Sequence, residues 1–457
     1  MSTSKELPIV QTFLGLPRPL LAGYIAIALF MTGDGFELAF LSQYITTLGY
    51  SKSESSLVFT VYGLAAAISA WSSGVIAELI TVRRAMRIGA ILWVVFHVCF
   101  LYFGLAEAHY GLIILFYGLR GLAYPLFLYS FVVAIVQNVN PRQVSPALGW
   151  FWTVYSIGIG VVGSFIPSIT IPMIGEYGTL WLALIFAVAG ACIAIFGLKH
   201  LRNSDKSKLS AKEKFGELLF AVKLFRNPHI TYAAIIRVIN TLSLFGFAVI
   251  MPMMFVDELG WTIDRWLLIW TVFFAVTIFS NVFWGIMNEI MGWINVIRYM
   301  GCLGMAFSTL SFYFIPQAFP DSFFMACIPA VLLGWFVGAF VAVTPIMTTL
   351  EPEHKGAAIS VYNLSAGASN FAAPAIAVLI LPHFGVQGVV YTYAALYILA
   401  FVLTFLLKVK QPGFNGAFKP RTPIDAEADA EVAHTPDHEQ EVVGSGAAAT
   451  ATITAQK

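Results

Sequence analysis

The sequence predicts an all-α membrane protein with about twelve transmembrane helices arranged as two six-helix bundles. Of its 457 residues, 59% are apolar and only 11% are charged, and the mean hydropathy is +0.82. Such a chain carries more apolar surface than one soluble core can bury. Polar or Pro- and Gly-containing breaks divide it into apolar stretches of roughly 20 residues, the length that crosses a bilayer. A longer polar segment separates the first six stretches from the last six.

The individual spans follow from these breaks. The first begins after Pro17-Arg18-Pro19 and ends without a small-residue cleavage pattern, so we expect a retained span and not a signal peptide. Nearly all Lys and Arg residues outside the spans fall on one side of the membrane, and the other side holds only Lys52 and Arg265. The positive-inside rule therefore places both termini in the cytoplasm. The expected spans are residues 20–46, 55–80, 86–106, 109–138, 145–170, 178–198, 230–256, 263–288, 295–315, 322–349, 357–381 and 387–408.

Four parts of the chain are expected. Residues 1–198 form an N-terminal six-helix bundle, and residues 229–410 form a C-terminal one. Residues 199–228 are rich in Lys and Arg and predict a cytoplasmic linker. Residues 411–457 are rich in Ala, Thr and Pro with scattered acids, a composition that cannot bury a core, so we expect a disordered cytoplasmic tail.

A short motif recurs at matching places in the two halves. The second expected helix ends in Gly74–Glu78 and the eighth ends near Gly285–Glu289, each a Gly-x3-Glu on the cytoplasmic side. Repeated halves are typical of transporters whose two bundles are related about the membrane normal. An acid here can cap a helix across the loop or pair with a base. Glu78, Arg83 and Glu289 are therefore candidate cytoplasmic gate residues, and an interfacial acid without a partner is the alternative.

Asp34 and Glu37 interrupt an otherwise apolar first span, and their spacing of three places them on one helix face. A charge at mid-span costs about 2.5–3.5 kcal/mol on insertion scales, so intramembrane acids mark functional sites. Arg120 lies at similar depth in the fourth span, and we expect it to pair with Asp34 because a paired buried charge is tolerable. Glu37 has no obvious cationic partner. Either acid could take a proton and release its partner, and a purely structural ion pair is the alternative.

Polar and aromatic side chains on other spans are candidates for contacting a substrate. Amides both donate and accept hydrogen bonds, which suits a polyhydroxy ligand, and aromatic rings can stack on its C–H faces. Aromatic residues in spans also serve packing and the interfacial belt, so a structural alternative exists. Because the acids lie in the first half and most amides in the second, we expect ion coupling in the first and substrate discrimination in the second. The candidates are Tyr117, Tyr124, Trp152, Tyr155, Arg237, Asn240, Asn281, Trp284, Asn363 and Asn370.

Composition disfavours several other functions. The four cysteines lie in separate apolar segments, which argues against a disulfide or metal framework. No span carries paired His or a Ser/His/acid set, so the chain is not expected to be an enzyme. A net charge of +1 gives no reason to expect nucleic acid. The expected partners are a small polyhydroxy substrate and the lipid bilayer, with a monomeric chain and no cofactor or metal beyond a coupling proton.

At these residues the sequence resembles the major facilitator superfamily, and within it the bacterial polyol permeases that carry ribitol and D-arabinitol. The resemblance covers residues 15–414 and is clearest at 30–37, 120–125, 237–246, 279–285 and 351–365. It implies the major facilitator fold in the bacterial inner membrane and proton symport of a linear sugar alcohol by alternating access. In similar sugar symporters an acid on the first helix paired with an arginine on the fourth carries the proton, and Asp34 and Arg120 match that pattern.

The sequence departs from the family at the loop after the second helix. There Glu78 replaces the usual Asp, Leu79 a basic residue and Thr81 a Gly. Two other interpretations also stay open. One is a proton-coupled organic-anion carrier in which Arg120 and Arg237 hold a carboxylate, and the other is an uncoupled polyol or sugar facilitator.

Overall fold

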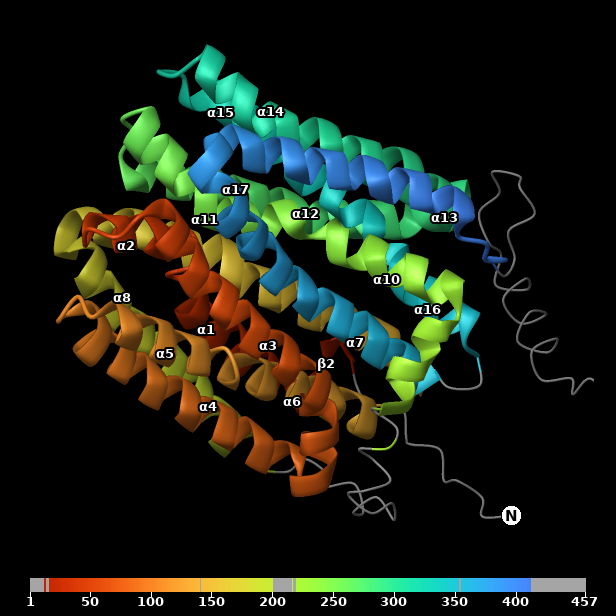
Figure 1. Ribbon diagram of the computed structural model, residues 1–457. Coiled ribbons are helices and arrows are strands. Elements are labelled where there is room, and N and C mark those ends of the chain that lie inside the picture. Colours follow the sequence, from red (N-terminus) through yellow and green to blue (C-terminus); the bar gives the residue numbers. More distant parts are fainter. Residues whose placement is uncertain are drawn as a thin grey trace, which may run out of the picture.

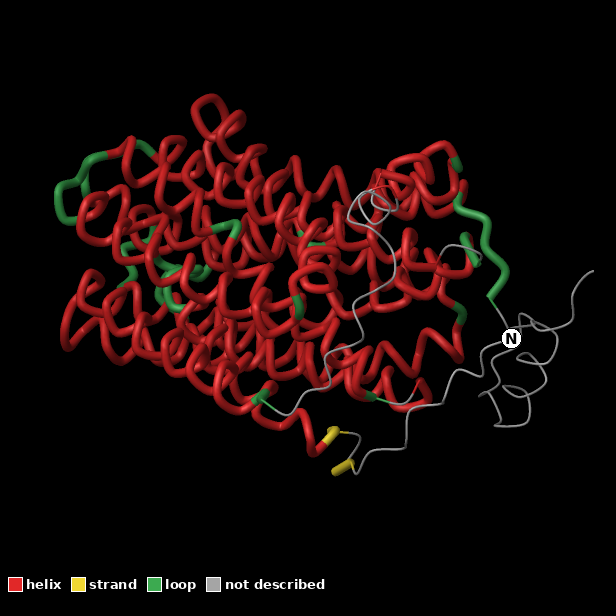
Figure 2. Tube along the Cα trace, turned by 90° about the horizontal axis from the view of Figure 1, so that it is seen from below, coloured by secondary structure: helices red, strands yellow, loops and turns green. Residues whose placement is uncertain are grey.

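The computed structural model describes residues 12–13, 16–139, 141–199, 216, 219–352 and 355–411. Within these ranges the chain is helical apart from β1 (Thr12–Phe13) and β2 (Leu16–Pro17), which pair antiparallel at the edge of the helical body (Figure 2). Helices of the first half gather on one side of the molecule and those of the second half on the other (Figure 1). Most of the expected linker and all but the first residue of the expected tail lie outside the described residues.

The first half follows the expected spans with local breaks. Its long helical runs continue through π-helical segments, which carry a widened turn inside a helix. Its elements are η1 (Arg18–Leu20), α1 (Leu21–Gly35), α2 (Leu41–Thr47), α3 (Lys52–Ile80), α4 (Val82–Cys99), η2 (Phe100–Leu105), α5 (Tyr110–Arg120), α6 (Ala123–Asn138), α7 (Pro141–Ser156), η3 (Ile157–Val162) and α8 (Gly163–Gly197).

The second half repeats this pattern of long runs with short breaks, and its first described element lies at the end of the expected linker. Its elements are η4 (Leu224–Arg226), α10 (Pro228–Asn240), α11 (Leu242–Met253), η5 (Met254–Glu258), α12 (Ile263–Met291), α13 (Trp293–Asn295), η6 (Val296–Leu303), α14 (Gly304–Ala318), α15 (Phe323–Val337), η7 (Gly338–Ala342), α16 (Val343–Leu350) and α17 (Lys355–Leu406).

Eight helical runs in the described residues are long and apolar enough to cross a membrane. Two of them, Ala147–Gly197 and Ala357–Leu406, each contain two of the expected spans. A glycine with positive φ interrupts each run, Gly175 in α8 and Gly385 in α17, because such a conformation is open to glycine. Figure 1 shows α17 as two legs that meet at a bend. These interruptions fall between the spans that the sequence predicts.

The first expected helix is broken, and this break positions Glu37, one of the two acids in that apolar stretch. α1 ends at Gly35, and residues 36–40 form a turn before α2. A Cβ added at Gly33 would collide with the backbone of α8, and one added at Gly35 would collide with Ile159 of η3. Both glycines therefore permit close approach of these segments. Two glycines in three positions also weaken the helix. Glu37 therefore lies in a turn, whereas the sequence predicted a continuous helix at this position.

The two halves meet along long helices. α3 packs along α17, and α8 packs on α12. A Cβ added at Gly63 would collide with the backbone of Asn370, and one added at Gly367 would lie 2.6 Å from Ala67 Cα. Small residues thus let α3 and the part of α17 before Gly385 approach backbone to backbone.

The repeated Gly-x3-Glu motif ends in matching backbone turns. Thr81 follows Glu78 by three residues, ends α3, and has φ 83° and ψ 143°. Gly292 follows Glu289 by three residues, ends α12, and has φ 91° and ψ 134°. The same turn therefore closes the corresponding helix of each half. Thr81 adopts it as a β-branched residue, for which positive φ is strained.

Candidate functional site

Arg120, the last residue of α5, is fully buried and contacts both acids of the first span. Its Nη1 donates to Glu37 Oε2 at 2.7 Å, and Nη2 contacts the other oxygen of Glu37. Nη2 also lies 3.8 Å from Asp34 Oδ1. The expected Asp34–Arg120 pair is confirmed. The expectation that Glu37 lacks a cationic partner is wrong, because the turn after α1 brings both of its oxygens to the guanidinium.

Two side chains of α4 complete this group, and neither was predicted from the sequence. Trp93 Nε1 donates to Asp34 Oδ1 at 2.7 Å. His97 Nδ1 lies 2.8 Å from Arg120 Nη1, and its Nε2 lies 3.0 Å from the Leu180 carbonyl oxygen. Arginine only donates and a carbonyl only accepts, so His97 is a neutral imidazole with its proton on Nε2. The available signal was a Trp and a His four residues apart on one face of an apolar span.

We call Asp34, Glu37, Trp93, His97 and Arg120 the charge cluster. With His97 neutral, it holds two carboxylates and one guanidinium, all 5% exposed or less. When both acids are ionised, one negative charge is in excess, and a proton on either acid removes it. The arrangement can therefore hold and release one proton. Among the described residues, no group of three or more His, Cys, Asp or Glu side chains is arranged to hold a metal.

Aromatic rings enclose the guanidinium and lead from it toward the second half. The rings of Tyr62 and Tyr117 lie 5.6 and 4.7 Å from the Arg120 guanidinium carbon. Tyr62 also stacks on Tyr117 and Tyr124, with ring centroids 4.6 and 5.9 Å apart. Tyr124 in turn accepts a hydrogen bond from Asn370 Nδ2 of α17 at 3.2 Å. Two predicted substrate residues from opposite halves, Tyr124 and Asn370, thus meet. Tyr62, which stacks on Tyr124, was not predicted.

Arg237 on α10 is the centre of a second group. Its guanidinium carbon lies 4.8 Å from the ring centroid of Tyr362 on α17, and Nη1 donates to Thr241 Oγ1 at 3.4 Å. It also interacts electrostatically with Tyr129 of α6 and Tyr155 of α7, so both halves surround it. None of the ion pairs in the described part of the chain joins Arg237 to a carboxylate. Neither Tyr129 nor Tyr362 was among the predicted substrate residues.

Other predicted substrate residues lie in different surroundings. Trp152 is 40% exposed and packs edge-on against Tyr155 of this second group. Trp284 is buried, and its Nε1 donates to the Trp335 carbonyl oxygen at 2.8 Å, so it packs between α12 and α15. Asn281 and Asn363 are partly exposed, as is Asn370.

The predicted cytoplasmic gate residues lie at the matching turns. Glu78 is exposed and Arg83 is half-buried where α3 turns into α4. Glu289 accepts hydrogen bonds from Trp293 Nε1 at 3.1 Å and from Gln411 Nε2 at 3.3 Å, both within the second half. These contacts tie the end of α12 to the segment that follows α17, and a gating role for the three residues stays a prediction.

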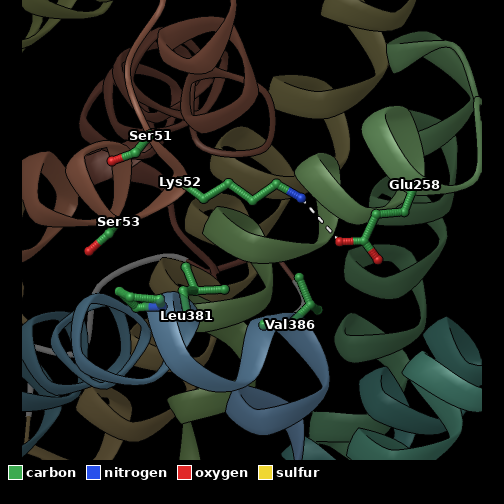
Figure 3. A pocket seen from close by; sticks show the side chains of 8 residues that line it. Ser51, Lys52, Ser53, Glu258, Leu381 and Val386 are labelled. Carbon is green, nitrogen blue, oxygen red and sulfur yellow. Dashed lines mark hydrogen bonds and ion pairs between the residues drawn. The ribbon is translucent and has the colours of Figure 1, made fainter.

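An unanticipated contact joins the halves at the opposite end, where α3 begins. Lys52 Nζ donates to Glu258 Oε1 at 3.0 Å and lies 3.7 Å from Asp257 Oδ2. Ser53 Oγ donates to the Val378 carbonyl oxygen at 3.0 Å. Figure 3 shows Lys52 extending across a pocket of about 240 Å³ toward Glu258. The other residues that line this pocket are Ser51, Ser53, Leu381, Pro382, Gly385 and Val386.

Comparison with known proteins is consistent with this architecture. The sequence profile of the Major Facilitator Superfamily matches residues 23–263 and 233–444. A ribitol transporter of Klebsiella pneumoniae is 62% identical over 403 residues, covering 88% of this chain and 94% of the relative. A D-arabinitol transporter of the same organism is 62% identical over 407 residues, covering 89% and 96%. An alpha-ketoglutarate permease of Bacillus subtilis (strain 168) is 34% identical, covering 87% and 91%.

Solved structures share the fold at low sequence identity. A mutant of the nucleoside transporter NupG has a TM-score of 0.68 at 12% identity, covering 85% of this chain and 99% of that one. A POT family transporter in complex with 5-aminolevulinic acid has a TM-score of 0.66 at 16% identity, covering 87% and 97%. From the profile match and the 62% identities we conclude that the chain belongs to the Major Facilitator Superfamily, whose members are multi-pass membrane transporters and not enzymes.

Proposed function

We propose that this protein is a secondary active transporter that couples uptake of a linear sugar alcohol to proton entry. Two relatives with 62% identity over nearly their whole length are named as transporters of ribitol and D-arabinitol. Both compounds are linear pentitols, which differ only in the configuration of their hydroxyls. We therefore take ribitol, arabinitol or a similar linear polyol as the substrate.

The observation that carries proton coupling is that two buried carboxylates share one guanidinium. Glu37 engages Arg120 with both oxygens, whereas Asp34 has one oxygen at 3.8 Å from it and a hydrogen bond from Trp93. Excess charge is unfavourable inside a bilayer, and a bound proton removes it. Because Asp34 interacts more weakly with Arg120 than Glu37 does, we assign the transported proton to Asp34. Glu37 then keeps its ion pair with Arg120 throughout the cycle.

The substrate site that we propose lies among the tyrosines and amides between the halves. A polyol presents hydroxyls that both donate and accept, and phenol and amide groups do the same. Tyr124 with Asn370, and Tyr129 and Tyr155 with Arg237, bring such groups together from both halves. The aromatic rings add apolar faces for the carbon chain.

The transport cycle in this proposal is alternating access of two six-helix bundles, residues 1–198 and 229–410, connected by residues 199–228. Twelve spans, both termini and the tail 411–457 in the cytoplasm, and a location in the bacterial inner membrane belong to the same proposal. In this orientation the contacts of Lys52 with Asp257 and Glu258 close the outer side. The chain acts as a monomer and uses no cofactor except the coupling proton.

The organic-anion alternative required Arg120 and Arg237 to hold a carboxylate together. Glu37 already engages Arg120, which disfavours that joint grip. The uncoupled-facilitator alternative differs from proton symport in its response to an imposed pH gradient, which the following experiment measures.

The test is uptake of radiolabelled ribitol and D-arabinitol by the purified protein in proteoliposomes, with and without an imposed pH gradient. We expect accumulation above equilibrium only with the gradient. Asp34→Asn should abolish accumulation while retaining counterflow, and Asp264→Asn, an acid at the start of α12, is the matched control. Accumulation by Asp34→Asn would remove Asp34 as the coupling residue. Gradient-independent uptake by the native protein would indicate a facilitator, and the absence of polyol counterflow would refute the substrate class.

A further inference from the structure

We propose that the group around Arg237 also binds a linear polyhydroxy carboxylate, the acid counterpart of a sugar alcohol. The carboxylate would lie on Arg237 and a neighbouring hydroxyl on Asn240. We call Tyr129, Tyr155, Arg237, Asn240 and Tyr362 the Arg237 cluster. The inference rests on the proposed function in one respect, namely that the transported polyol reaches this cluster.

Arg237 carries a buried donor that the described part of the chain leaves unused. Its Nε has no hydrogen-bond acceptor among the described residues. Its Nη1 makes a long contact of 3.4 Å with Thr241, and its face is covered by the ring of Tyr362. Buried donors in native proteins are nearly always satisfied, so an orphaned Nε indicates a place where an acceptor from a ligand fits.

Asn240 supplies an orphaned acceptor on the same helix. Its side chain is 7% exposed, and Oδ1 has no donor within the described part of the chain. A spacing of three places Arg237 and Asn240 on one face of α10. This face therefore offers one unused donor and one unused acceptor, which match a ligand that carries an acceptor group next to a hydroxyl.

The charge of the cluster favours an anionic ligand over a neutral one. Arg120 has two carboxylates beside it, whereas no described ion pair neutralises Arg237. Tyr129 of α6 and Tyr155 of α7 interact electrostatically with Arg237, and the ring of Tyr362 on α17 lies against its guanidinium, so tyrosines and not carboxylates are its neighbours from these helices. A polyol supplies acceptor oxygens without charge, while a carboxylate supplies the charge and two parallel acceptors that match the guanidinium fork. A single arginine suits a monoanion and not a dianionic phosphate ester.

The test compares ribitol with D-ribonate, which has the same carbon chain with a carboxylate at one end. Displacement of radiolabelled ribitol from the purified native protein in proteoliposomes gives both affinities. We expect D-ribonate to bind at least as tightly as ribitol. Arg237→Gln should weaken D-ribonate binding at least tenfold more than it weakens ribitol binding, and Arg237→Lys should fall between because it keeps the charge and loses the fork. Arg265→Gln, at the exposed start of α12, should change neither.

The outcomes separate this inference from the proposed function. If the native protein exchanges ribitol but D-ribonate fails to displace it, the inference is wrong and polyol transport stands. An equal loss of both ligands in Arg237→Gln, in protein that melts as the native protein does, would make Arg237 a general hydroxyl ligand and overturn the inference. If ribitol itself is not exchanged, the proposed function fails first.

Discussion

Replacing each acid of the charge cluster by its amide should separate their roles. In Glu37→Gln the buried Arg120 loses its bidentate partner, and Asp34, at 3.8 Å, is the one carboxylate that remains beside it among the described residues. Removing one member of a buried ion pair destabilises a protein by about 3–5 kcal/mol. The glutamine oxygen can still accept one hydrogen bond, so we expect a loss of stability near the lower end of this range, about 3 kcal/mol.

Asp34→Asn should behave differently. Arg120 keeps both oxygens of Glu37, the cluster becomes electrically neutral, and the amide oxygen can still accept from Trp93 Nε1. We expect a change of no more than about 1 kcal/mol, the size of one ordinary hydrogen bond. The variant should therefore melt close to the native protein while losing proton-driven accumulation.

The assay is thermal unfolding of the detergent-purified variants, paired with counterflow in proteoliposomes. Asp264→Asn controls for the removal of an acid outside the charge cluster. A melting temperature lower for Asp34→Asn than for Glu37→Gln would refute the division of roles, as would a native melting temperature for Glu37→Gln.

Three further predictions concern backbone turns, close packing and the contact at the start of α3. Thr81→Gly should stabilise the protein by up to about 1 kcal/mol because glycine adopts the positive φ without strain, and Gly292→Ala should lower the melting temperature for the converse reason. Unchanged melting temperatures in both variants would show that these turns are not strained. Gly35→Ala should destabilise the protein by about 1–3 kcal/mol, because the added Cβ overpacks against Ile159. A Cβ added at Gly74 meets no neighbouring atom within 4 Å, so Gly74→Ala should melt at the native temperature or above. Lys52→Gln should change stability by no more than about 1 kcal/mol but speed labelling, by an impermeant maleimide, of a cysteine placed in the nearby pocket. An unaltered labelling rate would exclude this lysine from closing that end.

The course of the chain was largely predictable because membrane spans depend on local composition. The breaks at Gly175 and Gly385 fall between expected spans, since a glycine is needed where the backbone adopts positive φ. The repeat was also visible, and its two Gly-x3-Glu motifs end in turns with nearly the same dihedral angles. The end of α1 at Gly35 was not predicted, because it accompanies close approach by η3.

The substrate candidates were harder to predict. Asn370 and Tyr124 were both selected and do meet, yet Trp284 is committed to packing, because the rotation of α12 turns it toward α15. Tyr129 and Tyr362 escaped selection, since a tyrosine in a span looks the same whether it packs or faces the other half. Only the relative placement of helices distinguishes these cases.

The sequence by itself determined which charges interrupt apolar stretches, because the position of a residue in such a stretch is a local property. It therefore identified Asp34, Glu37 and Arg120. Only the tertiary structure decided which of them bind one another, since that depends on the rotation and spacing of packed helices. It placed Glu37 on both nitrogens of Arg120, brought His97 against the same guanidinium, and left Arg237 without a carboxylate among the described ion pairs.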